Sequence, residues 1–225
     1  APARVKGVTV LVHDYIDSYE NPRRAWSYSP ATRRVRRAPD ITYDTLVNAS
    51  PLIVVDQYGT FNGAQDKYNW ELKGIKKMIV PAVSEGLSDN PLEVTHGVGH
   101  LNPEYINYEE KDVAVVHATL KDGQRHLYAS RTFYVTTDAF YIVSQDIYDG
   151  QGNLMRHAAN TLSQNVQGNG GECTINTEFT FDFATRQYAG NNMLGKAINT
   201  QPAVYNGPSK DVSFYTPDGL RRYAR

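Results

Sequence analysis

Four consecutive strand-length segments, each separated from the next by a short turn, constrain the fold of this chain more than any other feature. The predicted strands cover residues 113–120, 125–135, 140–148 and 154–165. Asp122-Gly123 and Asp149-Gly150 supply, in two of the turns, the positive φ that tight hairpins need. The sequence therefore predicts an antiparallel meander of neighbouring strands.

Further strands are predicted on both sides of the meander. Regular alternation predicts strands over residues 5–15, 69–81 and 177–183. In the second of these, Trp70, Leu72 and Met78 are expected to share one face. Residues 41–66 and 83–107 hold several glycines and prolines and predict irregular segments, the first with one short helical turn.

The composition favours a β domain. Sixteen tyrosines are the one excess, and tyrosine suits a pleated, half-buried surface. Helical periodicity is almost absent, so a large open antiparallel sheet has no amphipathic helix to cover one of its faces. We therefore predict a mainly β fold with few or no long helices, in a single domain over residues 1–225. The missing cover is a ligand, a partner or residues removed from the N-terminal side.

Charge and targeting signals exclude some functions. The formal net charge is −1, so the chain as a whole is not a nucleic-acid binder by charge. No apolar run reaches the ~20 residues of a transmembrane helix. Ala1-Pro2-Ala3 is not a secretory signal, which predicts either a cytosolic chain or a processed or truncated product. The single cysteine, Cys173, cannot form an internal disulfide.

An arginine-rich hairpin precedes the first irregular segment. Residues 24–28 and 33–37 flank a Ser29-Pro30-Ala31-Thr32 turn. The arginines are Arg23, Arg24, Arg33, Arg34, Arg36 and Arg37. Guanidinium groups bind carboxylate and phosphate oxygens in a bidentate way, but alternation divides these side chains between two faces, with Arg34 and Arg36 on one of them. The alternative is that they pair with acidic neighbours or keep an edge hairpin soluble.

Aromatic side chains are the candidate ligand-binding residues, because ligand pockets are mostly apolar with a few placed polar groups. The predicted binding residues are Trp26, Tyr28, Trp70, Phe133, Phe140, Phe179 and Phe181, together with Arg34 and Arg36 near the rim. Phe183 shares the alternation of Phe179 and Phe181. The alternative is that these rings form an ordinary core.

Metal and catalytic sites are not predicted. His96 and His100 have a ligand-like spacing, but Gly97 and Gly99 argue against a helix and no third ligand is evident. His126 and His157 lie in strands and are expected to be hydrogen-bonded polar residues. No nucleophile elbow or phosphate-binding loop is present, and nothing distinguishes Asp146 and Asp149 from surface acids. We predict no cofactor, no metal and no enzyme activity.

Several long motifs stand out along the chain: WSYSPATRRVRRAP at 26–39, FNGAQDKYNWELKGIKKMIVP at 61–81, HLNP at 100–103, ATLKDGQRHLYASRTFY and IVSQDIYDGQGNLMR within 115–156, and the terminal TPDGLRRYAR. These motifs resemble those of one family of bacterial periplasmic proteins, domain of unknown function 1329, which is described as similar to outer-membrane lipoprotein-sorting proteins. The resemblance implies that the chain is the C-terminal part of a longer precursor. It also implies a curved half-barrel sheet, like that of lipoprotein carriers, whose concave apolar face accepts acyl chains.

The resemblance further implies a periplasmic location in a Gram-negative envelope, after removal of a signal that this chain does not contain. It implies no enzyme activity and identifies no binding residues. Our first hypothesis is therefore a non-enzymatic envelope protein that binds or carries a lipid or other hydrophobic molecule, in association with an envelope transport system or a lipoprotein. The alternative is a structural or adaptor module whose open sheet docks on a partner protein or transporter.

Overall fold

The structure, a computed structural model, describes residues 7–39, 41–47, 50–165, 172–191 and 208–224. The chain divides into one unit of Ala1–Thr45, Ala64–Asp66 and Ala203–Arg225 and a second unit of Leu46–Gly63 and Lys67–Pro202. The single domain over residues 1–225 stays a prediction. Within the described ranges, no helix combines the length and apolar character needed to cross a membrane.

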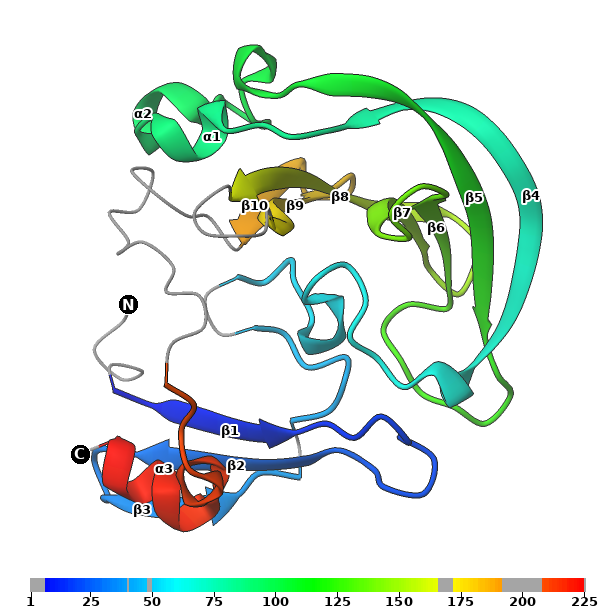
Figure 1. The fold of residues 1–225 in the computed structure, drawn as a ribbon. Coiled ribbons are helices and arrows are strands. Elements are labelled where there is room, and N and C mark those ends of the chain that lie inside the picture. Colours follow the sequence, from blue (N-terminus) through cyan, green and yellow to red (C-terminus); the bar gives the residue numbers. More distant parts are fainter. Residues whose placement is uncertain (1–6, 40, 48–49, 166–171, 192–207, 225) are drawn as a thin grey trace. The chain divides into compact units, whose positions relative to one another are not determined.

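The first unit contains a three-stranded antiparallel sheet, β1 (Thr9–His13), β2 (Arg24–Ser29) and β3 (Arg34–Arg37), in the order β1-β2-β3. The predicted arginine hairpin is therefore confirmed as β2 and β3 (Figure 1). The helix α3 (Pro217–Tyr223) contacts all three strands. It follows the short helix η6 (Val212–Tyr215), whose Tyr215 carbonyl lies 2.7 Å from His13 Nε2.

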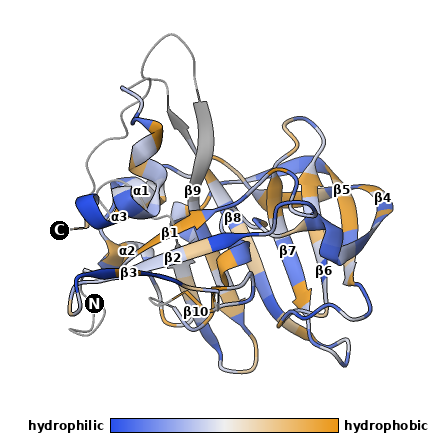
Figure 2. Ribbon diagram, turned by 90° about the horizontal axis from the view of Figure 1, so that it is seen from below, coloured by the Kyte–Doolittle hydropathy of each residue, from blue (hydrophilic) through white to orange (hydrophobic). Residues whose placement is uncertain are grey.

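The second unit contains a seven-stranded antiparallel sheet in the order β10-β9-β8-β7-β6-β5-β4. The strands are β4 (Tyr68–Pro81), β5 (Tyr108–Leu120), β6 (Ser130–Thr136), β7 (Ile142–Tyr148), β8 (Leu154–Asn165), β9 (Glu172–Asp182) and β10 (Gln187–Asn191). Figure 1 shows the long strands β4 and β5 curving together, and Figure 2 shows hydrophobic and hydrophilic segments interleaved along β4 to β8. The predicted mainly β fold and the meander are confirmed.

The two faces of this sheet are distinguished by their cross-strand partners, which lie on the same face. We call face A the side that carries Arg131, Gln145, Ala158 and Thr180, and face B the side that carries Tyr134, Asp146, His157 and Phe181. The alternation of side chains along β4 is interrupted, so the assignment of its residues to the two faces changes within the strand.

A β-bulge in β4 changes which of its residues share a face. The pairing with β5 shifts between Leu72 and Gly74, so Lys73 is an extra residue and Gly74 has a φ of 126° that favours glycine. Trp70 and Leu72 therefore lie on face A, whereas Met78 pairs with Lys111 and lies on face B. The prediction that these three side chains share one face was wrong, because unbroken alternation cannot reveal an inserted residue.

Face A is covered by the Leu46–Gly63 segment, which includes the predicted short helical turn, η2 (Val55–Gln57). A further short helix, η3 (Gln65–Lys67), precedes β4. Polar side chains of this segment and of the sheet are hydrogen-bonded to one another. Gln57 donates to Thr180 Oγ1 at 2.5 Å, and Gln145 donates to the Thr60 carbonyl at 2.7 Å. Arg156 donates to the Leu52 carbonyl at 2.9 Å. The Leu46–Gly63 part of the first irregular segment is thus held against the sheet by specific hydrogen bonds.

A buried ion pair lies at the centre of this contact. Arg131 Nη2 is 2.5 Å from Asp56 Oδ2, and both side chains are almost fully buried. His126 Nδ1 accepts from the backbone N–H of Tyr128, so its proton is on Nε2, which donates to Asp56 at 3.0 Å. Burial alone would raise the pKa of Asp56, but the charge of Arg131 and the hydrogen bond from His126 hold that pKa below its ordinary value.

Face B is covered over β8 and β9 by residues 82–107, which we call the cover. They form α1 (Gly86–Asp89), α2 (Leu92–Thr95) and η4 (Pro103–Tyr105), which are too short to give a helical period in the sequence. Two backbone hydrogen bonds join the cover to Leu162 of β8, at 2.9 and 3.1 Å, and Ser163 donates to Glu85 at 3.1 Å. The predicted irregular segment is therefore a short helical layer against the sheet.

Several strand boundaries differ from those predicted: β1 is shorter than residues 5–15, and β5 and β9 each begin five residues earlier than expected. The second meander strand begins at Ser130 rather than at Arg125, because the chain before it turns His126 and Tyr128 inward to the polar groups of the Leu46–Gly63 segment. The strand β10 was not predicted, since five residues that include a glycine give little alternation.

We predict that Asp56→Asn lowers the free energy of unfolding by about 3–5 kcal/mol near neutral pH, because it leaves the Arg131 guanidinium buried without a counter-charge. Denaturation in urea measures the change. Lys77→Ala is the control, since Lys77 forms exposed ion pairs with Glu110 and Asp112 that contribute little.

The same variant gives a pH dependence. Because the pKa of Asp56 is lowered from 3.8 in the folded state, its contribution is present above pH 3.8 and is lost as the pH falls through the lowered value. The difference between wild type and Asp56→Asn should therefore shrink in acid. Equal stabilities at neutral pH would contradict the role of this ion pair.

Candidate functional site

An apolar cavity lies against face B, between the sheet and the cover. Its volume is about 430 Å³, and its walls are the end of β4, the start of β5, residues 100–106 of the cover, and β7, β8 and β9. Ligand pockets commonly have volumes of about 300–1,000 Å³ and mostly apolar walls. The cavity is therefore of a size and character that suit a small hydrophobic ligand.

Phe179 and Phe181 form the β9 wall. Both lie on face B because residues two apart along a strand point the same way, and their rings meet edge to face at 5.6 Å. Phe179 is only 5 % exposed and packs with Leu87, Leu101 and Ile106 of the cover. Phe181 is half-buried and stacks on Tyr188 at 5.8 Å. The two predicted binding residues on β9 thus lie together at this cavity.

The opposite wall comes from the end of β4. Met78 and Val80 lie on face B only because of the bulge at Lys73, and both line the cavity. Val80 also packs with Val113 and Val143 in a buried cluster. Leu101 and Ile106 close the cavity from the cover.

A chain of three hydrogen-bonded polar side chains reaches the cavity from the sheet. His157 lines the cavity, and its Nδ1 is 2.7 Å from Asp146 Oδ1. Tyr134 donates its hydroxyl to Asp146 Oδ2 at 2.7 Å. Burial would raise the pKa of Asp146, but the hydrogen bonds from His157 and Tyr134 outweigh it and lower that pKa. Burial and the bond to Asp146 raise the pKa of Tyr134. The carboxylate is therefore ionised and fixes the imidazole ring.

This arrangement lacks the contact that a nucleophile needs. Ser144 also lines the cavity, but among the described side chains no hydrogen bond joins it to His157. Asp149, which we considered together with Asp146, lies in the turn after β7 and accepts from the backbone N–H groups of Gln151 and Asn153. The two carboxylates have separate roles and do not form an acid–base pair.

Trp70 and Phe133 lie on the other side of the sheet. They stack on face A with ring centroids 5.8 Å apart, and Phe61 meets both rings edge to face. Phe133 is 2 % exposed and belongs to the buried cluster of Tyr68 and Ala118. The structure therefore corrects the expectation that Trp70 and Phe133 share one concavity with Phe179 and Phe181. Phe140, in the turn between β6 and β7, is 81 % exposed and lines no part of the cavity.

The four predicted residues of the arginine hairpin belong to the first unit. Cross-strand pairs place Trp26 and Tyr28 on one face of the small sheet, and Arg34 and Arg36 on the opposite face. The two pairs cannot line one site, which corrects their grouping. Tyr28 is buried, Trp26 packs edge to face on His13 at 4.8 Å, and both arginines are exposed.

The alternative of pairing with acids applies to Arg23, whose Nε is 2.6 Å from Asp14 Oδ1. His96 and His100, whose spacing resembles that of metal ligands, have separate partners. His96 Nδ1 lies 2.7 Å from the Tyr188 hydroxyl, and His100 Nδ1 lies 2.7 Å from the Leu101 carbonyl. In the part of the chain that the structure describes, no three His, Cys, Asp or Glu side chains are placed to hold a metal ion. The lack of a metal or cofactor stays a prediction. Cys173 lies in β9 where side chains are not described.

Sequence reasoning missed Tyr134, Asp146 and His157 as a connected group. The signal was present, because adjacent strands of a meander place alternate residues on one face, and the turn lengths constrain the register. The cover residues Leu101 and Ile106 carried no such signal, since their contacts depend on the path of residues 82–107.

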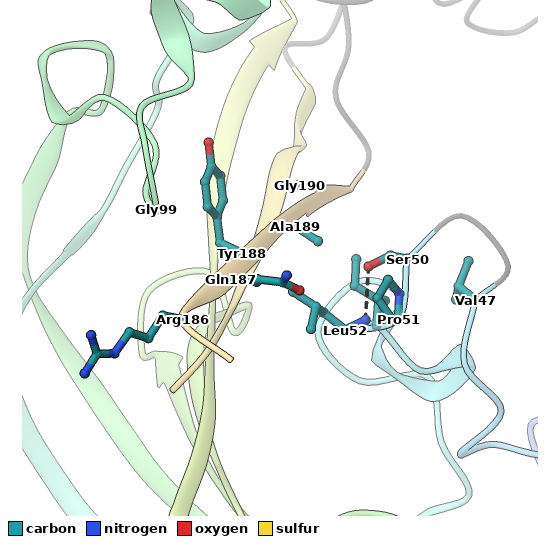
Figure 3. Close-up of a pocket in the computed structure, with 11 residues that line it drawn as sticks. Val47, Ser50, Pro51, Leu52, Gly99, Arg186, Gln187, Tyr188, Ala189 and Gly190 are labelled. Atoms are coloured by element: carbon teal, nitrogen blue, oxygen red, sulfur yellow. Dashed lines mark hydrogen bonds between the residues drawn. The ribbon is translucent and has the colours of Figure 1, made fainter. Parts of the chain in front are cut away.

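A second cavity, of about 520 Å³, lies between β10 and the start of the Leu46–Gly63 segment. Figure 3 shows Gln187 and Ala189 of β10 facing Leu52 and Pro51, with Tyr188 turned toward Gly99. Two of its lining residues, Val47 and Ser50, are separated in the sequence by residues 48–49, which are outside the described ranges. We therefore base no function on it.

Comparison with known proteins identifies a family and several solved structures with a similar fold. The family model described as "Protein of unknown function (DUF1329)" matches residues 1–221. The chain is 35 % identical over 229 aligned positions to uncharacterized protein PA3922 of Pseudomonas aeruginosa, covering 99 % of this chain and 48 % of that protein. It thus spans about half the length of this relative.

Two solved structures have a similar fold. One is a domain from Vibrio parahaemolyticus named for outer membrane lipoprotein sorting, with a TM-score of 0.62, 14 % identity, and coverage of 99 % of this chain and 74 % of that one. The other is a DUF1329 family protein from Desulfovibrio piger, with a TM-score of 0.57, 17 % identity, and coverage of 98 % and 73 %. At these identities the likeness is one of fold.

We predict that Phe179→Ala lowers the free energy of unfolding by about 3–5 kcal/mol, because it opens a void between β9 and the cover. Phe140→Ala is the matched control and should stay within about 0.5 kcal/mol of wild type, since its ring is exposed. Guanidinium denaturation of the two variants checks both values. Equal losses would mean that the cover does not pack on Phe179 in solution.

Proposed function

Because the chain belongs to the DUF1329 family, whose function is unknown, we propose a function from the geometry: the protein binds a lipid or other hydrophobic small molecule in the face B cavity. The observation that carries the proposal is the apolar cavity itself, about 430 Å³ in volume and walled by Phe179, Phe181 and Met78. Apolar surface buried on binding contributes about 25 cal/mol per Å². The affinity therefore comes mainly from the aromatic and aliphatic walls.

The fold supports the same proposal. The chain shares its fold with a domain named for outer membrane lipoprotein sorting, and its motifs resemble those of periplasmic proteins. We propose a location in the periplasm and a role in binding or carrying, without catalysis. An envelope transport system or a lipoprotein as partner stays a prediction. Arg34 and Arg36 lie in the first unit and have no part in the proposed cavity.

We predict saturable binding of a fluorescent fatty acid, such as cis-parinaric acid, with a stoichiometry near one to one. Phe181→Asp should reduce the affinity at least tenfold, because a charge in the apolar wall must be desolvated by the ligand chain. Since Phe181 is half-buried, the variant should keep the circular dichroism spectrum of the wild type.

Phe140→Asp is the matched control and should bind like wild type, because Phe140 lies outside the cavity. Unfolding of Phe181→Asp would favour a purely structural core. Failure of the wild type to bind any of several lipid classes would overturn the proposal.

A second candidate function, docking on a partner protein, is favoured by one observation. The edge strand β4 carries a row of exposed apolar side chains on face A: Leu72, Ile75 and Ile79 are 65 %, 65 % and 67 % exposed. Exposed apolar patches and open strand edges often mark protein interfaces. Lys73 and Lys77 on the same strand supply charge that opposes indiscriminate pairing.

If this strand is a docking surface, the isolated wild-type protein should self-associate with rising concentration, whereas Leu72→Lys with Ile75→Lys should remain monomeric. Sedimentation velocity measures both. Substituting Lys76, which lies on face B of the same strand, by Ala is the control. A wild type that stays monomeric at all concentrations and captures no partner would leave lipid binding as the better account.

A further inference from the structure

His157 presents an unused ring nitrogen at the wall of the cavity. Its Nδ1 is bonded to Asp146, whereas Nε2 has no hydrogen-bond partner among the residues that the structure describes. The side chain is half-buried, and its cross-strand partner is Phe181. A polar group of the ligand that lies beside the aromatic wall therefore meets Nε2.

The hydrogen bonds behind His157 determine what Nε2 offers. A carboxylate only accepts, so Asp146 takes one proton from His157 Nδ1 and another from the Tyr134 hydroxyl. The Asp146 carboxylate, 2.7 Å from Nδ1, is a counter-charge for a protonated ring, in which Nε2 also carries a proton and donates. The lowered pKa of Asp146 agrees with this, because it keeps the counter-charge in place.

From this geometry, and resting on the proposed function, we infer that the cavity takes a single-chain amphiphile whose anionic terminal oxygen, of a carboxylate or a phosphate, accepts a hydrogen bond from His157 Nε2. The volume of about 430 Å³ is near the lower end of ligand pockets and suits one chain rather than the several chains of a membrane lipid. A charge-assisted hydrogen bond selects the acid over the corresponding alcohol.

The other charged and titratable groups near His157 agree with an anion. Lys76 on β4 lies 5.1 Å above the Tyr134 ring, and its charge helps to lower the pKa of Asp146. His100 lines the cavity from the cover. On the strands next to β8, β7 contributes Asp146, whereas β9 contributes the uncharged Phe181. Only the protonated ring donates from Nε2 while Nδ1 donates to Asp146, so binding of the anion should weaken under conditions in which the ring is neutral.

The test compares three probes with the same chain: dodecanoate, dodecyl phosphate and dodecan-1-ol, each below the concentration at which it aggregates. Isothermal titration calorimetry at about pH 5.5 and about pH 8.5 compares the affinities under an acidic condition, which favours charged imidazoles, and an alkaline one, which favours neutral imidazoles. We expect at least one anion to bind about tenfold or more tightly than the alcohol at the lower pH, and to lose that preference at the higher pH. The preferred anion identifies the carboxylate or the phosphate source.

The variant His157→Gln should bind the acid and the alcohol alike, with little pH dependence. His117→Gln is the matched control: His117 lies on face B of β5, where its Nδ1 is bonded to Thr132, and it does not line the cavity. It should keep the preference of the wild type. The comparison of acid with alcohol on wild type tests the inference without any variant, should His157→Gln fail to fold.

Each outcome has one meaning. Equal binding of all three probes to the wild type, or a preference that survives in His157→Gln, would overturn the role of His157 and leave the cavity proposal standing. No binding of any probe would instead overturn the proposed function. Hydrolysis of 4-nitrophenyl dodecanoate that depends on Ser144 and His157 would replace recognition by catalysis, since the ester bond would break at a serine near this imidazole.

Discussion

The buried ion pair between Arg131 and Asp56 determines which face of the large sheet the Leu46–Gly63 segment covers. An arginine in the middle of a sheet needs a counter-charge when water is excluded, and the chain supplies one from 75 residues earlier. That requirement fixes the Leu46–Gly63 segment across face A, where Gln57, Thr60 and Leu52 then find their own hydrogen-bond partners in the sheet. This part of face A is therefore covered by another segment of the same chain.

Face B has a different character. Its cover is made of helices four and three residues long, and only a few of its side chains, such as Leu87, Leu101 and Ile106, are buried against the sheet. Regions with few buried contacts open at a lower free-energy cost than the core. A site that has to admit a hydrophobic molecule is better placed under such a layer than under the polar contacts of face A.

The sequence was a good guide wherever local chemistry decides the structure. The meander followed from its Asp-Gly turns, and the arginine hairpin from its Pro-containing turn. It was a poor guide where the outcome depends on distant partners. Nothing near Arg131 indicates Asp56, and nothing near Phe179 indicates Leu87. The contact between His157 and Asp146 is an intermediate case. It can be predicted that they share a face of adjacent strands, but only once the turn between the strands fixes their register.

The extra residue Lys73 determines which side chains of β4 share a face. Because Lys73 is unpaired, the residues from Gly74 to Pro81 alternate from a new starting point. Met78 and Val80 therefore line the cavity on face B, whereas the side chains of Ile75 and Ile79 are exposed on face A. If Lys73 instead paired with Val115 in a regular ladder, the two sets would exchange faces without any change in their identities, whereas deletion of Lys73 would remove the bulge and leave both sets on their present faces. One change of register at Lys73 would therefore alter both the apolar wall of the cavity and the exposed surface of β4, with no substitution in either.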